Sequence, residues 1–320
     1  MQKIAVLTSG GDAPGMNAAI RSVVRKGLSM NIEVYGIKRG FAGLFDPKPF
    51  TKLYMDSVAD IIHRGGTILL TARAPEMLKP DNQDKAADRL KSEGIDGLIV
   101  IGGDGSYRGA MTLEQRGIQT IGIPGTIDND INGSDLSIGF DTAVNTIIES
   151  VNRLRDTATS HERIFIVEVM GRESGHLALA VGLAGGAESL LVPEMPYDLN
   201  VICQRLMNGI ASGKSHSIII LAEGAADINE LNDKIRSRIQ TDTRIAVLGH
   251  IQRGGSPNAI DRILGSRMGA AAVDLLLEGM SGVATVVRGE DVISKPLNQC
   301  VQYKKPFPKD LFDLVITLAR

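Results

Sequence analysis

The sequence has 320 residues, 43% of them hydrophobic, and its 35 basic and 37 acidic side chains give a formal net charge of −2. This length favours two α/β lobes over one small domain. The near-neutral charge, the lack of Trp and an aromatic content of 4% argue against a nucleic-acid partner or a membrane surface, which need basic runs or stacking side chains. An anionic ligand must therefore be bound by locally placed arginines.

The two cysteines, Cys203 and Cys300, form no C-x-x-C pair and have no histidine cluster beside them. They give neither a disulfide framework nor a zinc site, and they favour a reducing compartment. The apolar run at residues 4–7 is too short for a signal sequence, and no run of about 18 apolar residues could span a bilayer. We therefore expect a cytoplasmic protein with no membrane partner.

Short apolar, β-branched runs alternate along the chain with segments of helical periodicity. Runs that are apolar on both faces are typical of buried parallel strands, and their alternation with helices indicates βαβ units. The expected strands are residues 4–7, 33–37, 97–101, 120–123, 164–169, 217–222 and 244–248, and helical patterns include residues 17–28, 84–92 and 141–157. The sequence therefore predicts an α/β fold with doubly wound, mainly parallel sheets.

Polar segments that contain glycine follow most of the expected strands. In doubly wound sheets the ligand binds beyond the carboxyl ends of the strands. We therefore expect these segments to form the walls of one cleft. They are residues 9–12, 102–106, 170–172, 223–224 and 250–255.

The first of these segments leads into GGDAPG at residues 10–15. Because glycine has no Cβ, backbone N–H groups of this segment can approach phosphate oxygens closely, and the following helix adds the positive end of its dipole. An ordinary strand-to-helix turn is the alternative. The spacing matches neither the G-x-G-x-x-G fingerprint nor the Walker motif, which argues against a nicotinamide oxidoreductase and a P-loop NTPase.

Residues 102–106 (GGDGS) combine a glycine turn with one carboxylate. Asp104 suits a Mg²⁺ ion held against a polyphosphate, whose oxygens the backbone can follow. The alternative is a helix N-cap provided by Ser106 or Asp104, and the two roles are compatible.

Residues 126–130 (TIDND) are unusually polar for a segment that leaves an apolar strand. Two carboxylates two residues apart can divide the work of catalysis. One accepts the proton of an attacking hydroxyl, and the other helps to place a metal ion or water. A turn built from Asp and Asn is the alternative.

Five arginines lie near strand ends or glycine turns, where a planar guanidinium can clamp a phosphate with two hydrogen bonds. A single one would be interpreted as a surface ion pair. Five at such positions, with His250 nearby, indicate a phosphate site. They are Arg73, Arg163, Arg172, Arg244 and Arg253.

Taken together, these segments resemble the bacterial ATP-dependent 6-phosphofructokinase family over nearly the whole chain. One glycine turn is a weak match, whereas six ordered motifs are a strong one. The matching runs are residues 7–18 (LTSGGDAPGMNA), 63–67 (HRGGT), 102–106 (GGDGS), 124–130 (PGTIDND), 168–172 (EVMGR) and 249–255 (GHIQRGG).

The resemblance implies two doubly wound, mainly parallel-sheet lobes with the active site in the cleft between them. The larger, ATP-binding lobe would comprise residues 1–139 and 253–305, and the smaller, sugar-phosphate-binding lobe residues 140–252 and 306–320. It further implies a glycolytic kinase that moves the γ-phosphoryl of MgATP to the 1-hydroxyl of fructose 6-phosphate, which gives fructose 1,6-bisphosphate and ADP.

The same resemblance assigns roles to individual residues. Asp128 would be the base, and Asp104 would bind Mg²⁺ with help from Asp130. Around the transferred phosphoryl group it places Gly11, Thr126, Arg73 and Arg172. Other groups at the nucleotide would be Ala74, Gly103, Gly105 and Ser106, with Phe41, Ala74 and Met77 facing the adenine. The 6-phosphate would be held by Arg163, Arg244, His250 and Arg253, and the sugar lined by Met170, Gly171 and Glu223. Because Arg163 and Arg244 reach across from a neighbouring subunit in this family, a homotetramer is implied.

Two positions discriminate the phosphoryl donor. The diphosphate-dependent relatives carry a carboxylate in place of Gly105, which repels the α-phosphate of ATP, and a lysine in place of Gly125, which neutralises a diphosphate. The two glycines therefore favour ATP, and a diphosphate-dependent enzyme is the alternative.

The family also binds ADP or phosphoenolpyruvate at a regulatory site between subunits. Residues that match this pattern are Arg21, Arg25, Arg155, Glu188, Lys214 and His216. Met55 and Ser212 stand where relatives commonly carry basic residues, and each lost charge-assisted contact removes about 1–3 kcal/mol. The sequence therefore predicts weak effector binding.

Two other functional classes fit these motifs less well. NAD kinases and lipid kinases share the GGDG turn, but they are not expected to carry residues 126–130 together with the Arg/His cluster. A non-catalytic nucleotide or sugar-phosphate sensor should have lost its base or its metal carboxylate, yet Asp128 and Asp104 are both present.

Overall fold

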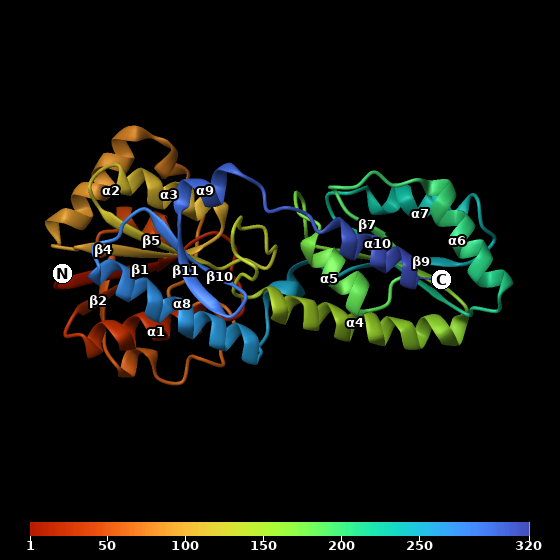
Figure 1. Ribbon diagram of the computed structural model, residues 1–320, viewed down its shortest axis with the longest axis horizontal. Coiled ribbons are helices and arrows are strands. Elements are labelled where there is room, and N and C mark those ends of the chain that lie inside the picture. The colour runs from red at the N-terminus through yellow and green to blue at the C-terminus, as the bar shows by residue number, and fades with distance from the viewer. Residues whose placement is uncertain (320) are drawn as a thin grey trace. The chain divides into compact units, whose positions relative to one another are not determined.

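The computed structural model describes residues 1–319, and its chain divides into two compact units. The first unit comprises Met1–Thr142 and Arg253–Lys305, and the second comprises Ala143–Gln252 and the segment from Pro306 onward. Each unit contains one β-sheet (Figure 1). The assignment of ATP to the first unit and of the sugar phosphate to the second remains a prediction.

The sheet of the first unit has seven strands in the order β11-β10-β5-β4-β1-β2-β3. The five central strands pair in parallel, and the two edge strands pair antiparallel with their neighbours. The central strands are β1 (Lys3–Thr8), β2 (Glu33–Ile37), β4 (Gly97–Gly102), β5 (Gln119–Pro124) and β10 (Val283–Arg288), and the edges are β3 (Phe50–Leu53) and β11 (Asp291–Pro296).

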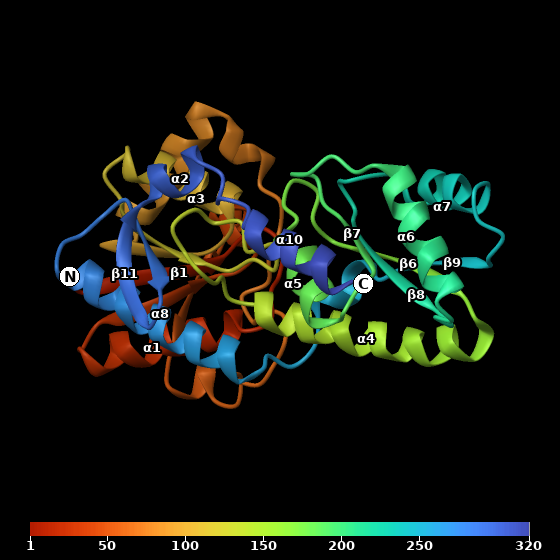
Figure 2. The same cartoon turned by 45° about the vertical axis from the view of Figure 1, so that its right-hand side comes forward.

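Helices cover both faces of this sheet (Figures 1 and 2). On one face lie α1 (Met16–Ser29) and α8 (Ala259–Leu277); on the other lie α2 (Pro80–Ser92), α3 (Asp104–Glu114) and α9 (Leu297–Gln302). The short 3₁₀ helices of this unit are η1 (Gly40–Phe45), η2 (Asp56–Val58) and η3 (Pro75–Leu78). Gly269 allows helices α1 and α8 to pack closely, since a Cβ at this position would lie only 2.7 Å from the carbonyl oxygen of Ala19.

The sheet of the second unit has four parallel strands in the order β7-β8-β6-β9. The strands are β6 (Ile164–Val169), β7 (Ser189–Leu191), β8 (Ser217–Ala222) and β9 (Thr243–Val247). The remaining helices of the chain are α4 (Phe140–His161), α5 (His176–Ala184), α6 (Leu199–Ala211), α7 (Ile228–Arg236), η4 (Gly249–Arg253) and α10 (Lys309–Leu318). Apolar side chains of α6 and α7 form one core cluster with β6 and β8. No helix within residues 1–319 is long and apolar enough to cross a membrane.

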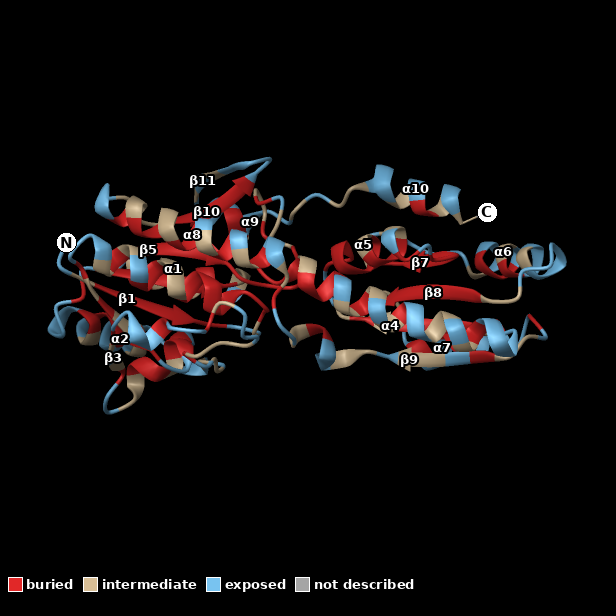
Figure 3. Ribbon diagram, turned by 90° about the horizontal axis from the view of Figure 1, so that it is seen from below, coloured by how far each residue is buried: buried red, intermediate tan, exposed pale blue. Residues whose placement is uncertain are grey.

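The predicted α/β fold with mainly parallel, doubly wound sheets is confirmed. Four of the five central strands, β1, β4, β5 and β10, are almost wholly buried (Figure 3), whereas Glu33 and Tyr35 of β2 are half-buried. Sequence reasoning missed four strands. Of these, β7 has only three residues, and β3 and β11 are partly exposed edges that lack a continuous apolar run. The fourth, β10, was missed although five of its six residues are buried.

Candidate active site

A cavity of about 910 Å³ lies in the first unit, beyond the carboxyl ends of β1, β4 and β5. It brings together ten of the residues assigned by sequence to the nucleotide, the phosphoryl group or the sugar phosphate. They are Gly11, Arg73, Ala74, Gly103, Asp104, Gly105, Ser106, Thr126, Asp128 and Arg253. Asp130, Phe41 and Met77 line the same cavity.

The glycine turn after β4 is shaped by close backbone packing. A Cβ at Gly102 would lie 2.4 Å from the carbonyl oxygen of Ser9 and 2.3 Å from the Ser106 Oγ, so only glycine fits. Helix α3 begins at Asp104, and its N-cap residue is Gly103, with no side-chain cap. The expectation that Ser106 or Asp104 provides the N-cap is therefore wrong. Among the residues that the structure describes, the buried Ser106 Oγ has no hydrogen-bond partner.

The acidic loop that follows β5 is held from behind by its own chain. Thr126 donates its N–H to the Ile138 carbonyl at 3.1 Å, and the Ser137 hydroxyl donates to the Thr126 carbonyl at 2.8 Å. Asn129 adopts a left-handed φ of 49°, and its Oδ1 accepts the Ser137 N–H at 3.0 Å. Asn129 therefore serves as a clamp, while Asp128 and Asp130 line the cavity on either side of it.

Negative charge accumulates in this cavity. Burial, together with the charges of Asp128 and Asp104, raises the pKa of Asp130 to about 6, against opposing contributions from its backbone hydrogen bond and Lys305. Such a cluster attracts a cation, and carboxylate oxygens are the ligands that Mg²⁺ prefers. Within residues 1–319 no group of three or more acidic, His or Cys side chains could hold a metal by itself. Mg²⁺ therefore fits here as an ion that brings phosphate oxygens and water as its other ligands.

Asp104 also has a protein partner that sequence reasoning missed. The Arg108 Nε donates to its Oδ2 at 3.1 Å, one turn along α3, while Arg108 Nη2 donates to the Val301 carbonyl. Both side chains of this pair are about half exposed, at 60% and 45%, so the ion pair is weak and a cation can replace it. The i,i+4 spacing of the two residues is a signal that could have revealed it.

Arg253 lies against the first glycine turn. A Cβ at Gly11 would come within 2.2 Å of its Nη1, and the same nitrogen donates to the Asp12 carbonyl at 3.3 Å. This predicted 6-phosphate ligand therefore lies in the cavity of the first unit, beside residues that the sequence assigned to the transferred phosphoryl group.

Other predicted site residues gather at the carboxyl edge of the second sheet. Met170, Gly171 and Arg172 follow β6, and Glu223 follows β8. The two loops are joined because Glu223 donates its N–H to the Val169 carbonyl and Gly224 donates to Gly171. A Cβ at Gly224 would meet the Arg172 carbonyl at 1.8 Å.

His250 belongs to η4, which follows β9. The fully buried Gln252 ties this segment to the end of β6, because its Oε1 accepts the Met170 N–H at 3.1 Å and its Nε2 donates to the Gly249 carbonyl at 2.9 Å. Gln252 was missed as a site residue because a lone Gln carries no chemical signature in a sequence.

Arg163 and Arg244 lie at the opposite end of the same sheet. Arg163 directly precedes β6, and Arg244 is the second residue of β9. Both guanidinium groups contact the Oδ2 of Asp242, at 2.7 and 2.9 Å. A strand of six residues is about 20 Å long, so within one chain this pair does not join Met170, Arg172 and Glu223 at the carboxyl edge.

The predicted effector residues fall into separate groups. Glu188 and Lys214 form an ion pair of 2.6 Å, Arg155 donates to the Gly185 carbonyl, and the His216 Nδ1 lies 3.0 Å from the Thr159 hydroxyl. Arg21 and Arg25 lie on α1 in the first unit.

A cavity that holds acidic side chains beside a glycine turn, on a doubly wound scaffold, is characteristic of a kinase. Comparison with known proteins defines the kind. A family model described as phosphofructokinase matches residues 3–276. The ATP-dependent 6-phosphofructokinase of Natranaerobius thermophilus is 54% identical over 325 residues, and the alignment covers 100% of each chain. That of Bacillus subtilis is 52% identical over 314 residues, with 98% of each chain covered.

A solved structure of phosphofructokinase from Saccharomyces cerevisiae superimposes with a TM-score of 0.91 at 34% identity, over 100% of this chain and 48% of the yeast chain. The chain therefore belongs to the phosphofructokinase family, and within it to the ATP-dependent 6-phosphofructokinases of glycolysis. The predicted family, fold class and enzyme class are confirmed by these matches.

Proposed function

We propose that Asp128 is the base that starts phosphoryl transfer from ATP to fructose 6-phosphate. Its carboxylate accepts the proton of the 1-hydroxyl, the hydroxyl oxygen forms a bond to the γ-phosphorus, and the bond to the bridging oxygen breaks with its electron pair moving to ADP. The observation that carries the proposal is the placement of Asp128 in one cavity with Gly11, residues 103–106 and Arg253.

The charge of the transferred group is stabilised by donors around the cavity. The Gly11 N–H, Thr126 and Arg73 come from the first unit, and we assign Arg172 of the second unit to the same task. Asp104 and Asp130 are the groups that would hold Mg²⁺. When bound, that ion neutralises the developing charge on the β- and γ-phosphates.

The sugar phosphate is assigned to residues from two copies of the chain. Met170, Gly171, Arg172, Glu223 and His250 would bind it from one copy, with Arg253. Arg163 and Arg244 would reach the 6-phosphate from a neighbouring copy. Their position at the amino end of the second sheet supports this, since the other sugar-binding residues of that unit lie at or beyond the carboxyl ends of its strands. A homotetramer in the cytoplasm is part of the proposal.

The open space at Gly105 supports ATP as donor. A Cβ there would meet nothing within 4 Å, so a carboxylate at this position would project into the nucleotide cavity and repel a phosphate. At Gly125 a Cβ would press against Ile101 and Met16, both at 3.1 Å, which disfavours the lysine of diphosphate-dependent enzymes. An assay coupled to ADP release, with fructose 6-phosphate and either ATP or diphosphate, tests this. Turnover with ATP alone is expected, and turnover with neither donor would reject the proposed function.

Effector binding at Arg21, Arg25, Arg155, Glu188, Lys214 and His216 is proposed to be weak. Met55 and Ser212 offer no charge to a phosphate, although both are exposed. Steady-state inhibition should therefore require high concentrations of phosphoenolpyruvate, and strong inhibition at low concentrations would contradict this.

A further inference from the structure

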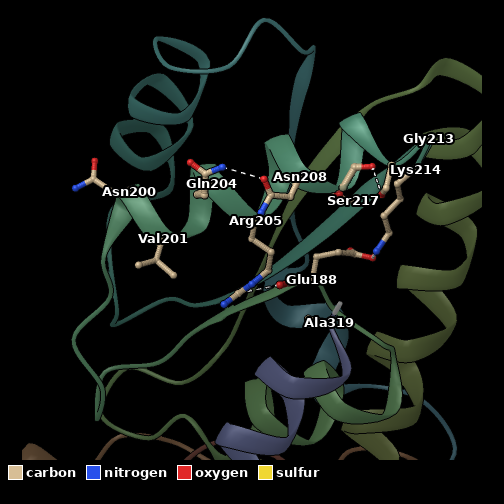
Figure 4. Close-up of a pocket in the computed structure, with 12 residues that line it drawn as sticks. Glu188, Asn200, Val201, Gln204, Arg205, Asn208, Gly213, Lys214, Ser217 and Ala319 are labelled. Carbon is tan, nitrogen blue, oxygen red and sulfur yellow. Dashed lines mark hydrogen bonds and ion pairs between the residues drawn. The ribbon is translucent and has the colours of Figure 1, made fainter.

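A half-buried cation, Lys305, lies beside the acidic loop of the first unit. It is the last residue of this unit, and its Nζ donates to the main-chain carbonyl of Asp135 at 2.9 Å. This acceptor is neutral, so the hydrogen bond does not itself neutralise the positive charge of Lys305. Lys214 differs in this respect, because in the predicted effector cavity beside α6 its ammonium contacts the Glu188 carboxylate at 2.6 Å (Figure 4).

The carbonyl that accepts the hydrogen bond of Lys305 also binds the acidic loop. Asn129 donates its Nδ2 to the same Asp135 oxygen at 3.2 Å. Asp135 in turn donates its own N–H to the Val287 carbonyl at 2.8 Å, which ties it to the end of β10. The ammonium of Lys305 and the amide of Asn129 therefore meet at one main-chain oxygen, directly before Asp130 in the loop.

The charge of Lys305 also acts on the carboxylates of this segment. Burial lowers the pKa of Lys305 to about 8, and the negative charges of Asp135 and Asp130 oppose that shift. The same attraction opposes the rise in the pKa of Asp130. An ammonium that is partly withdrawn from water interacts more strongly with nearby carboxylates than an exposed one does. Lys305 therefore offsets part of the negative charge that accumulates around Asp130.

The hydrogen bond and the charge of this lysine have different consequences for the cavity. The acidic loop carries the proposed base, Asp128, and Asp130 of the proposed metal site, and both line the cavity. A catalytic group displaced by about 1 Å can lose about 100-fold in rate, so a hydrogen bond that fixes the loop supports turnover. A metal ion, in contrast, binds more weakly when an ammonium stands nearby. Loss of Lys305 should therefore lower turnover and strengthen metal binding.

We propose that Lys305 is a positioning residue for phosphoryl transfer, which holds the acidic loop through the Asp135 carbonyl and offsets the charge of Asp130. It acts through Asn129 and Asp130 and is not itself a catalytic residue. The inference rests on the proposed role of Asp128 as the base, because a rate effect through the loop requires a base that the loop carries. Lys305 and Asp135 lie 170 residues apart in the sequence, so no local pattern indicates this role.

Turnover and Mn²⁺ binding of full-length Lys305→Met, measured side by side, test the proposal. Methionine keeps most of the length of the side chain, so packing around it is retained. We expect kcat to fall at least about 10-fold, with little change in the KM for fructose 6-phosphate. The dissociation constant of Mn²⁺, measured by electron paramagnetic resonance in the ADP-loaded protein, should fall by about two- to fivefold. A lysine with a merely structural role would not give these opposite changes, since a loosened cavity weakens both turnover and metal binding.

Two other variants keep the test decisive. Lys305→Arg retains a cation and a donor, and it should keep most of the kcat and the Mn²⁺ affinity of the wild type. Lys309→Met removes an exposed lysine of α10 that pairs with Asp313, and it should change neither. The proposal would be overturned by an unchanged kcat in Lys305→Met, or by Mn²⁺ binding in that variant that is no tighter than in the wild type. A loss of kcat in Lys305→Arg as large as in Lys305→Met would also overturn it.

Asp128→Asn, assayed beside these variants, separates this proposal from the proposed function. If Asp128→Asn loses its kcat and Lys305→Met does not, Asp128 remains the base and only the positioning role of Lys305 is refuted. The Mn²⁺ measurement needs no turnover, so it tests the effect of the lysine charge independently of the base.

Discussion

The three carboxylates of the first cavity sit in unequal surroundings, and this inequality divides their roles. Burial and the charges of its two acidic neighbours raise the pKa of Asp130. A nearby cation would therefore stabilise the charged form of this carboxylate in particular. Asp104 lies at the start of α3 and already has Arg108 as a partner. The Asp128 N–H donates to the Thr126 hydroxyl at 3.2 Å, which helps to hold the residue that we propose as the base.

Replacing Arg108 by Met should strengthen metal binding. The change removes the cation that competes for the Asp104 carboxylate, and an exposed ion pair of this kind is worth about 0.2–1 kcal/mol. The dissociation constant of Mn²⁺, measured by electron paramagnetic resonance in the ADP-loaded protein, should therefore fall by about 1.4- to fivefold. Arg116→Met removes a cation paired with Asp84 that does not line the cavity, and it serves as the control. Equal or weaker Mn²⁺ binding in Arg108→Met would show that the pair does not compete with the metal.

Sequence reasoning was able to select Asp104 and Asp128 because each lies in a polar segment after an apolar strand and in one of the six ordered motifs that resemble a known family. The clamp by Asn129 was not predictable, since its partner Ser137 is set by the path of the loop. The ion pair of Arg108 with Asp104 could have been predicted, because the two residues lie one helical turn apart. The roles of the selected residues stay predictions; their shared cavity is an observed placement.

At the scale of elements, α8 fixes the loop that carries Asp128. The side chain of Asp261, fully buried in the first turn of α8, accepts the Gly139 N–H at 2.8 Å and the N–H and hydroxyl of Thr142 at 2.8 and 2.5 Å. Burial raises the pKa of this carboxyl, and the hydrogen bonds from Thr142 and Gly139 oppose the shift. The residues just before Gly139 pair in turn with residues 124–126, so the acidic loop depends on this contact.

Asp261→Ala should therefore lower both stability and turnover. The Gly139 N–H and the Thr142 groups lose a buried acceptor, which costs about 2–4 kcal/mol, and the loop of Asp128 loses its support. Urea unfolding gives the change in free energy, and kcat measured well below the unfolding temperature gives the catalytic loss. Asp274→Asn, at a half-buried position on the same helix that pairs with Lys26, should change each by little. If Asp261→Ala matched this control, the support of the loop by α8 would be refuted.

The elements themselves were predicted unevenly. Buried parallel strands such as β6 and β8 were placed with the bounds that the structure gives, because both of their faces demand apolar side chains. The edge strands β3 and β11 were missed because one side of an edge faces solvent and the apolar signal is lost. The contact of Asp261 with Gly139 joins positions 122 residues apart, and no local pattern indicates it.

At the scale of the whole molecule, the proposed active site needs more than one copy of the chain. Arg163 and Arg244 share Asp242 at the amino end of the second sheet, whereas Met170, Arg172 and Glu223 follow strands at its carboxyl end. A closed oligomer lets one copy supply what its neighbour lacks. Both the predicted bounds of the two units and the predicted sharing of the site between copies came from the family resemblance. Sequence periodicity shows strands and helices, but it does not show which copy of the chain completes a site.

Mixing two inactive variants tests this arrangement. Asp128→Ala and Arg244→Ala, unfolded together and refolded as a mixture, should regain about a quarter of wild-type activity at low fructose 6-phosphate, because a quarter of randomly paired sites receive both intact residues. Asp128→Ala mixed with Thr126→Ala should regain none, since both residues come from one chain. The absence of any recovery in the first mixture would place Arg244 in the same copy as Asp128, or outside the site.

The central claim is that Asp128 acts as a base, and the steady-state kinetics of Asp128→Asn test it most directly. Asparagine keeps the size and polarity of the side chain but cannot accept the proton, so kcat should fall by about 10²–10⁴-fold while the KM values for ATP and fructose 6-phosphate change little. Asp135→Asn changes a nearby exposed carboxylate that pairs with Arg288 and should retain most of its kcat. A loss confined to KM in Asp128→Asn, with kcat preserved, would contradict the account and make Asp128 a binding residue only.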